Sequence, residues 1–346
     1  MRVSGGNRYA VAIRTVGTRA AGLGHVRRCL TLAVALQDVG GHVEFWLDTD
    51  EDSAAGTDFN AGLLVRRAGF TVRRTNGWQL PVDAPDVLVA DAYDVSPEFI
   101  KLARTKVPLV VAIEDLADRV LPADIVVSVG AAVEGRDARY PSHTTCLFGF
   151  PYALLESEVS DRAEPSPSVS LRRLLITVGV ADHRRLVPRL MRWASDGAPD
   201  FGQDVVVGPF FDNTREIEAQ ASTMTNVSLW HQPLHLATLM RRVDLAVAGG
   251  GQTLIELMGC GTPTAVVTLY DNQLPQVEAL SRCGAIACAG RWDDSDLGNR
   301  VSRTLRGLID PTRRTALSRA ARHHIDGKGA KRVADVVTEQ LQQVQS

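Results

Sequence analysis

The chain has 346 residues, of which 45% are hydrophobic and 23% charged, and its formal net charge is −2. This length predicts about two domains, and the composition is sufficient for ordinary hydrophobic cores. The near-neutral charge and the scattered arginines argue against a nucleic-acid-binding protein, which usually carries a basic stripe.

The cysteines are few and widely spaced, which predicts reduced thiols in a cytoplasmic protein and no disulfide framework. There is no Cys-x-x-Cys pattern, and His323-His324 has no cysteine nearby, so we expect neither a metal nor a cofactor. No apolar run approaches the ~18 residues of a membrane span. Residues 1–8 are polar and lack the apolar core of a signal peptide. The five cysteines are Cys29, Cys146, Cys260, Cys283 and Cys288.

In the first half, short apolar runs alternate with helical patterns such as His25–Val39 and Pro97–Thr105. Near-continuous apolar strands between helices are typical of parallel sheets covered on both faces. We expect a first domain over residues 1–155. Its predicted strands are Tyr9–Ile13, Val43–Leu47, Val87–Ala90, Leu109–Ile113 and Ile125–Val127.

Residues 156–170 contain Pro165, Pro167 and several serines, which predicts a linker. A second strand–helix series follows, so we expect a second domain over residues 171–346, including the C-terminal helices. Two such doubly wound domains usually face each other across a cleft at the carboxyl ends of their strands. The predicted strands are Leu174–Val178, Val205–Val207, Val227–Trp230, Leu245–Ala248, Thr264–Val267 and Ile286–Ala289.

The first chemical motif is Gly22-Leu23-Gly24-His25, between a predicted strand and a predicted helix. Glycines at such a junction allow a close backbone approach to a ligand, and a helix N-terminus favours phosphate. The same field disfavours an imidazolium, so we expect His25 to be neutral and able to accept a proton. Arg28 shares a helix face with His25 and is available either to steer a phosphate or to pair with a carboxylate.

The second motif is Asp244–Glu256, in which an apolar strand ends in Gly249, Gly250 and Gly251 and a helix follows at once with Gln252 and Thr253. This predicts another helix N-terminus that can hold a diphosphate. Glu256 lies one turn further, where a carboxylate can accept hydrogen bonds from ribose hydroxyls. The alternative is a glycine-rich turn followed by a solvent-exposed glutamate.

As an ordered set, several motifs resemble the PseG/SpsG-like nucleotide-sugar hydrolases, which act on UDP-2,4-diacetamido-2,4,6-trideoxy-β-L-altropyranose. Besides Gly22–Leu30 and Gly249–Glu256, the matching segments are Asp91–Tyr93, Glu114–Arg119, Gly149–Leu155, Gly179–Asp182 and Asn272-Gln273. This family is related to glycosyltransferases of GT-B architecture, including the one that adds N-acetylglucosamine to lipid-linked peptidoglycan precursors.

The resemblance implies a GT-B α/β fold of two Rossmann-like domains and a metal-independent reaction on a nucleotide-diphosphate sugar, with UDP as the first candidate. The N-terminal half would hold the sugar, with His25 as the base that activates water for attack with inversion. The C-terminal half would bind the nucleotide, with residues 230–236 bordering the base and the glycine loop contacting the diphosphate.

The chain also departs from the family pattern at positions expected to contact the sugar or the diphosphate. The acid of the first loop is replaced by Val16, and an arginine by Glu156. One glycine of a Gly-Gly-x-Asp motif is lost at Val178, and a usual Asp-Asp pair reads Glu114-Asp115. A glycosyltransferase that uses the same donor is therefore the alternative function, and a binding protein that has lost the reaction is a third.

Other residues have two readings each. Gly24, Arg28, Tyr93, Asp115, Asn272 and Gln273 are candidate substrate contacts, and Gly179 and His231 join the nucleotide-binding set. Tyr93 can instead be a rim aromatic, Asp115 a partner of Arg119, and Asn272 a helix cap. For His231 and His235, capping of a helix beginning at Leu234 is favoured over catalysis, and Asp182 is a further candidate to meet phosphate. The sequence leaves the oligomeric state open.

Overall fold

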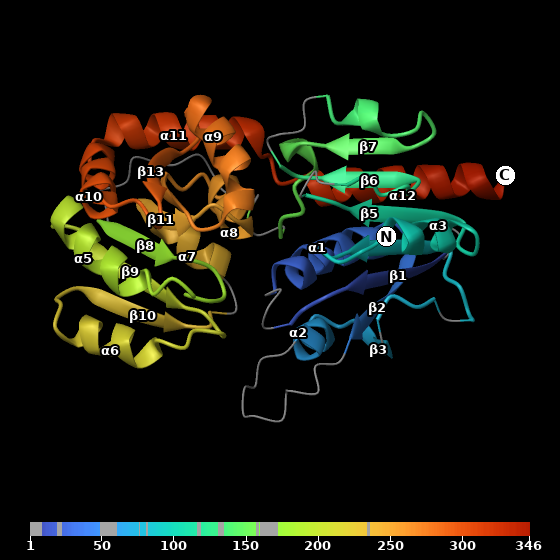
Figure 1. The fold of residues 1–346 in the computed structure, drawn as a ribbon, viewed down its shortest axis with the longest axis horizontal. Coiled ribbons are helices and arrows are strands. Elements are labelled where there is room, and N and C mark those ends of the chain that lie inside the picture. Colours follow the sequence, from blue (N-terminus) through green and yellow to red (C-terminus); the bar gives the residue numbers. More distant parts are fainter. Residues whose placement is uncertain are drawn as a thin grey trace, which may run out of the picture. The chain divides into compact units, whose positions relative to one another are not determined.

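The protein is described from a computed structural model over residues 9–18, 23–48, 61–75, 77–80, 82–115, 119–130, 135–156, 159, 172–233 and 236–346. It divides into two compact units (Figure 1), the first comprising Met1–Leu154 with Lys328–Ser346 and the second Leu155–Gly327. No helix in the described ranges combines the length and the apolar character needed to cross a bilayer.

The first unit is built on a seven-stranded parallel sheet of order β3-β2-β1-β4-β5-β6-β7. Its strands are β1 (Tyr9–Thr15), β2 (Gly41–Asp48), β3 (Thr71–Thr75), β4 (Val87–Asp91), β5 (Leu109–Ile113), β6 (Ile125–Ser128) and β7 (Thr145–Phe148). Its helices are α1 (Gly24–Asp38), α2 (Ala61–Arg67), α3 (Pro97–Arg104) and α12 (Gly329–Gln345), with short 3-10 turns η2 (Asp137–Arg139) and η3 (Phe150–Tyr152).

The second unit has a six-stranded parallel sheet of order β10-β9-β8-β11-β12-β13. Its strands are β8 (Arg173–Thr177), β9 (Gly202–Val207), β10 (Val227–His231), β11 (Leu245–Gly249), β12 (Thr264–Thr268) and β13 (Ala287–Arg291). Its helices are α5 (Val187–Gly197), α6 (Thr214–Ser222), α7 (Leu236–Arg242), α8 (Gln252–Gly259), η4 (Asp271–Gln273), α9 (Leu274–Arg282), α10 (Leu297–Leu308) and α11 (Pro311–His324).

In both units the strand order reverses direction beside the first strand, between β1 and β4 and between β8 and β11. In doubly wound sheets, ligands bind outside the carboxyl ends of the strands at this reversal. All the strands predicted from apolar runs are present, and the expected two-domain parallel α/β architecture is confirmed. The elements that were not predicted include α2, α6, β3 and β7.

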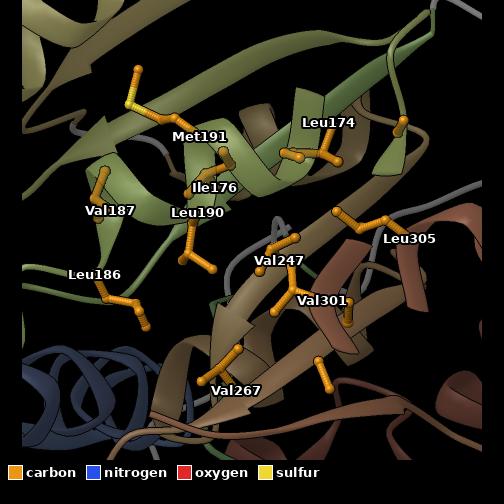
Figure 2. Close-up of a cluster of buried hydrophobic side chains, with 14 of the residues drawn as sticks. Leu174, Ile176, Leu186, Val187, Leu190, Met191, Val247, Val267, Val301 and Leu305 are labelled. Carbon is orange, nitrogen blue, oxygen red and sulfur yellow. The ribbon is translucent and has the colours of Figure 1, made fainter. Parts of the chain in front are cut away.

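The core of the second unit explains why its helices cover the sheet. Leu174 and Ile176 of β8 and Val247 of β11 pack against side chains of α5 and α10, and all are buried (Figure 2). On α5, Val187, Leu190, Met191 and Ala194 recur at helical spacing and form its buried face. Burial of one such aliphatic side chain contributes about 1.5–3 kcal/mol.

The last helix corrects one sequence-based assignment. Both C-terminal helices were expected in the second domain, but α12 packs against α1, β5 and η3 of the first unit. The side chain of Tyr9 is hydrogen bonded to Thr338 at 3.0 Å, and Arg332 donates to the carbonyl of Pro151 at 2.8 Å. The residues that cover the apolar face of α12 are distant from it in the sequence. The folded structure is therefore needed to show where this face is buried.

Candidate functional site

The carboxyl ends of β1, β4 and β5 gather several of the predicted residues of the first unit. Asp91 is the last residue of β4, and the parallel register pairs it with Thr15 of β1 and Ile113 of β5. Asp115 follows two residues after β5. His25 is the second residue of α1, and the described part of the first motif begins at Leu23, so Gly22 lies outside it.

Asp91 is the centre of this cluster, and its side chain is fully buried. Its Oδ1 lies 2.8 Å from Nδ1 of His25 and accepts from Nη2 of Arg28 at 2.5 Å. Its Oδ2 accepts from Nε of Arg28 at 2.7 Å and from Sγ of Cys29 at 3.3 Å. Both carboxylate oxygens are therefore occupied, and the buried acid is fully hydrogen bonded, as buried charges must be.

These contacts decide which nitrogen of His25 carries the proton. An ionised carboxylate only accepts hydrogen bonds, so Nδ1 donates to Asp91 and carries a hydrogen. Nη2 of Arg28 lies 3.1 Å from the same Nδ1, but a guanidinium only donates, so both groups share Oδ1 as their acceptor. In the neutral ring, Nε2 is then the nitrogen with the free lone pair. No hydrogen bond joins Nε2 to another described residue.

The positive charge of Arg28 compensates the negative charge of the Asp91 carboxylate. Burial by itself raises the pKa of Asp91, but the Arg28 guanidinium and His25 outweigh it and hold that pKa well below its usual range. Burial also raises the pKa of the Cys29 thiol, with Asp91 adding to the effect, so this thiol stays protonated and donates. Asp91 therefore remains ionised at neutral pH and orients the imidazole.

Arg28 settles one of the open alternatives, because it pairs with carboxylates. It contacts Asp91 and, through Nη1, Asp115, and its side chain is only 8% exposed. Asp115 does not pair with Arg119, as one interpretation had it. Arg119 instead donates to the carbonyls of Tyr93 at 2.6 Å and Ala92 at 3.3 Å, which ties down the loop after β4.

Tyr93 lies directly beside the candidate base. Its ring meets the imidazole of His25 edge to face, with the centroids 4.5 Å apart, and 47% of the residue is exposed. Edge-to-face pairs of this kind fix ring orientation. Tyr93 is thus half open to solvent while it packs against His25.

Sequence reasoning missed two features of this region. Asp91 was quoted in a motif but was not itself given a role, although a carboxylate that ends a buried strand is a signal. Glu114 and Arg136 form a second buried ion pair at 2.5 Å, with side chains 1% and 8% exposed. Arg136 also donates to Ser128 at 2.7 Å. The consecutive acids Glu114 and Asp115 are therefore each held by a different arginine.

In the second unit, the predicted glycine loop has the expected strand–turn–helix form. Gly249 ends β11, Gly250 follows, and Gly251 is the N-cap of α8, whose first residues are Gln252 and Thr253. No side chain caps α8. The N–H of Leu254 already donates to the carbonyl of Gly251 at 3.0 Å, and the N–H groups of Gln252 and Thr253, at the very start of the helix, have no partner within it. This N-terminus therefore presents the donors and partial positive charge that suit an anion.

Close packing requires glycine at the first two positions. A Cβ on Gly249 would lie 2.6 Å from Leu269 Cδ1, and one on Gly250 would lie 2.6 Å from Val277 Cγ2. A Cβ on Gly251 would meet only Gln273 Nε2, at an ordinary 3.4 Å. The first two glycines are therefore needed for packing, whereas the third has room for a Cβ.

Gln273 holds this loop in place. Its Oε1 accepts from the backbone N–H groups of Gly250 at 3.2 Å and Leu269 at 3.0 Å, and Gln276 donates to the carbonyl of Gly250 at 3.1 Å. Asn272 is exposed. The interpretation of Asn272 as a helix cap is wrong, because no side chain caps α9.

The loop after β8 places two further candidates. Gly179 has φ +100°, which favours glycine, and no atom lies within 4 Å of a Cβ built there. Asp182 is buried and accepts from the N–H groups of Leu186 and Val187 at 2.7 and 3.0 Å and from Asn213 at 2.9 Å. Its side chain caps the start of α5 and is not available to a phosphate.

Glu256 and His231 are the remaining candidates. Glu256 lies half-buried in α8, one turn after Gln252. His231 ends β10, and its Nε2 lies 3.7 Å from a carboxylate oxygen of Glu218 of α6. His235 and Leu234 lie outside the described residues. Trp230, beside His231, donates from its indole nitrogen to Asp204 at 2.8 Å.

Comparison with known proteins supports the fold assignment. No family model matches the chain. The spore coat polysaccharide biosynthesis protein SpsG of Bacillus subtilis is 22% identical over 334 residues, covering 93% of this chain and 96% of that protein. An uncharacterised protein of Methanocaldococcus jannaschii is 25% identical over 276 residues, and the match covers 76% of this chain but only 56% of that relative's length.

Solved structures of glycosyltransferases have the same fold. MurG of Acinetobacter baumannii superposes with a TM-score of 0.62 at 14% identity, covering 96% of this chain and all of that one. UGT89C1 of Arabidopsis thaliana in complex with UDP superposes with a TM-score of 0.66 at 12% identity, again covering 96% and 100%. The chain has the GT-B fold. At these identities the likeness shows the architecture and does not extend to the substrate.

Proposed function

We propose that this protein is an enzyme that hydrolyses a nucleotide-diphosphate sugar at the anomeric C–O bond with inversion, with His25 as the general base. The observation that carries the proposal is the pair formed by Asp91 and His25 at 2.8 Å. A carboxylate on Nδ1 fixes the tautomer and stabilises the imidazolium that forms, which is the role of the acid in Ser-His-Asp triads. Nε2 is then the atom that takes the proton.

The reaction balances without a further reactant. Nε2 of His25 removes a proton from water, and the water oxygen forms a bond to the anomeric carbon on the face opposite the diphosphate. The bond from that carbon to the diphosphate oxygen breaks, and its electron pair stays on the leaving group. General-base catalysis of this kind contributes about 10²–10⁴-fold.

The glycine loop of the second unit is proposed to hold the leaving group. The N-terminus of α8 offers N–H groups to the diphosphate, which gains negative charge as the bond breaks. Glu256 is proposed to accept hydrogen bonds from the ribose, and His231, Gly179, Gln252 and Thr253 to line the nucleotide site. Gly24 and Tyr93 contact the sugar in this proposal.

UDP is the first nucleotide to test. The motifs resemble those of UDP-sugar hydrolases, and UGT89C1 was solved with UDP and with UDP-L-rhamnose. The glycosyltransferase VinC was solved with dTDP, so dTDP is the second.

Transfer to an acceptor is the second candidate function. Two comparisons favour it. The solved structures with this fold are glycosyltransferases, and the relative SpsG is named for polysaccharide biosynthesis. An acceptor hydroxyl or amine would replace the water, and the role of His25 would be unchanged.

The test uses the purified full chain. Thermal shift with UDP, CDP, GDP and dTDP identifies the nucleotide, because a ligand that binds only the native state raises the melting temperature. UDP-sugars are then incubated with and without acceptors, and free UDP is measured. Release without acceptor is expected; release only with acceptor establishes transfer instead.

His25→Ala is expected to lower kcat by about 10²–10⁴-fold. His42→Ala is the matched control, because His42 is an exposed histidine on β2. An unchanged rate in His25→Ala would remove the proposed base. If no nucleotide raises the melting temperature and no sugar nucleotide is cleaved, the enzyme proposal fails as a whole.

A further inference from the structure

An arginine stacked on aromatic rings lies at the carboxyl edge of the second sheet. Arg184 belongs to the loop between β8 and α5, two residues ahead of Leu186. Its guanidinium carbon lies 3.8 Å from the ring centroid of Trp292, after β13, and 5.7 Å from that of Tyr270, after β12. The helix α5 begins at Val187, after this loop.

Arg184 forms no ion pair with a carboxylate in the described part of the chain. The two acids of the same edge, Asp271 and Asp293, are both paired with Arg291, at 2.9 and 3.1 Å. The pKa of Asp293 is lowered chiefly by its hydrogen bond to Arg291, and the charge of Arg184 lowers it by a smaller amount. The adjacent Arg185 pairs with Glu216 at 3.4 Å. Arg184 thus packs against aromatic rings, whereas the nearby charged side chains Asp271, Asp293 and Arg185 form ion pairs with other residues.

The strand order places the loop that carries Arg184 next to the glycine loop. In the sheet, β11 lies between β8 and β12, so the contact of Arg184 with Tyr270 joins the loops on either side of β11. Tyr270 lies three residues before Gln273, whose side chain holds Gly250. The loop after β8, the glycine loop and the loop after β12 therefore share one edge of the sheet.

Stacking also prepares the guanidinium for an anion. A guanidinium that lies over an aromatic ring still has its N–H groups in its own plane, where a phosphate accepts two of them at once. The arginine of the first unit that sequence reasoning considered for phosphate, Arg28, is occupied by Asp91 and Asp115.

We propose that Arg184 binds the diphosphate of the nucleotide and supplies the positive charge that stabilises the leaving group. This inference rests on the proposed function. As the anomeric C–O bond breaks and its electron pair moves to the diphosphate, Arg184 donates hydrogen bonds to the phosphate oxygens. The backbone N–H groups of α8 supply the remaining donors.

The experiment compares UDP, UMP and uridine by isothermal titration calorimetry on the full chain, in the wild type and in Arg184→Gln. UDP affinity is expected to fall about 10- to 100-fold, the loss that charge-assisted hydrogen bonds predict. UMP is expected to lose less, and uridine to bind as before. Arg185→Gln is the matched control, because Arg185 is the next residue and its side chain is 62% exposed. It should bind UDP as the wild type does.

Arg184→Lys separates charge from geometry and replaces the glutamine variant if that one does not fold. Lysine keeps the charge but loses the planar fork, so UDP affinity should be intermediate and should retain its salt dependence. Equal UDP affinity in the wild type and both variants would overturn the inference, as would an equal loss for UDP and uridine. If the wild type binds none of UDP, dTDP, GDP and CDP, the proposed function fails first, and this inference fails with it.

Discussion

Replacing Asp91 by asparagine tests the structural argument for the base most directly. The carboxylate accepts four hydrogen bonds, two on each oxygen. An amide has one accepting and one donating end, so whichever way the new side chain is turned, its NH₂ group faces donors of Arg28 and either His25 or Cys29. Removing one partner of a buried ion pair costs about 3–5 kcal/mol, and we expect Asp91→Asn to lose that much unfolding free energy at pH 7.

The pH dependence of this loss has a definite sign. The folded-state pKa of Asp91 lies well below its ordinary value, so in acid the unfolded state binds the proton first. The stability contributed by Asp91 is therefore fully present above about pH 5 and declines as the pH falls below that. The difference in unfolding free energy between wild type and Asp91→Asn should narrow from pH 7 to pH 4.

The assay is urea unfolding at several pH values, followed by circular dichroism. Asp94→Asn is the matched control, because Asp94 is an exposed aspartate three residues further along the chain. Its unfolding free energy should stay within about 0.5 kcal/mol of the wild type. Turnover of Asp91→Asn should fall about 10²–10⁴-fold, since the tautomer of His25 is no longer fixed. An unchanged stability at pH 7, or a difference that does not narrow in acid, would refute the reasoning.

Three further predictions concern packing and charge. Gly250→Ala should destabilise the protein by about 1–3 kcal/mol, because its Cβ would lie 2.6 Å from Val277 Cγ2. Gly251→Ala should unfold like the wild type, because its Cβ would meet only Gln273 Nε2, at an ordinary 3.4 Å. It should bind UDP more weakly, because Gly251 is the N-cap of α8, where the diphosphate is proposed to bind; equal UDP affinity would count against diphosphate binding there. Arg136→Met should cost about 3–5 kcal/mol by removing the arginine from buried Glu114. The exposed pair of Arg73 and Asp83 provides the control, and Arg73→Met should cost at most about 1 kcal/mol in the same urea titration.

Much of the fold was predictable because most of its strands are continuous apolar runs in the sequence. An apolar run such as Leu109–Ile113 is buried on both faces and is recognisable without knowledge of its neighbours. The strands that were missed, β3 and β7, lie at the edges of the first sheet and have one neighbour each. Thr71–Thr75 has two arginines and no fully buried side chain, so it carries no apolar pattern.

For the candidate sites, the backbone elements were predictable from the sequence. The helix that follows Gly249–Gly251 begins at Gln252, as the glycine run predicted. The roles of individual polar residues were less accessible. Asp182 was considered for phosphate binding but caps α5, and Gln273 was considered for the sugar but secures the glycine loop.

By itself, the sequence determined the parallel α/β architecture and the two glycine-bearing strand–helix junctions, because each depends on neighbours within one segment. Only the tertiary structure decided that His25, Arg28, Asp91 and Asp115 form one hydrogen-bonded network, and that α12 belongs to the first unit. Residues 25 and 91 are 66 positions apart, and residues 28 and 115 are 87 apart. They meet because β4 lies between β1 and β5 in the sheet. This strand order depends on how helices distant in the sequence bury both faces of the sheet.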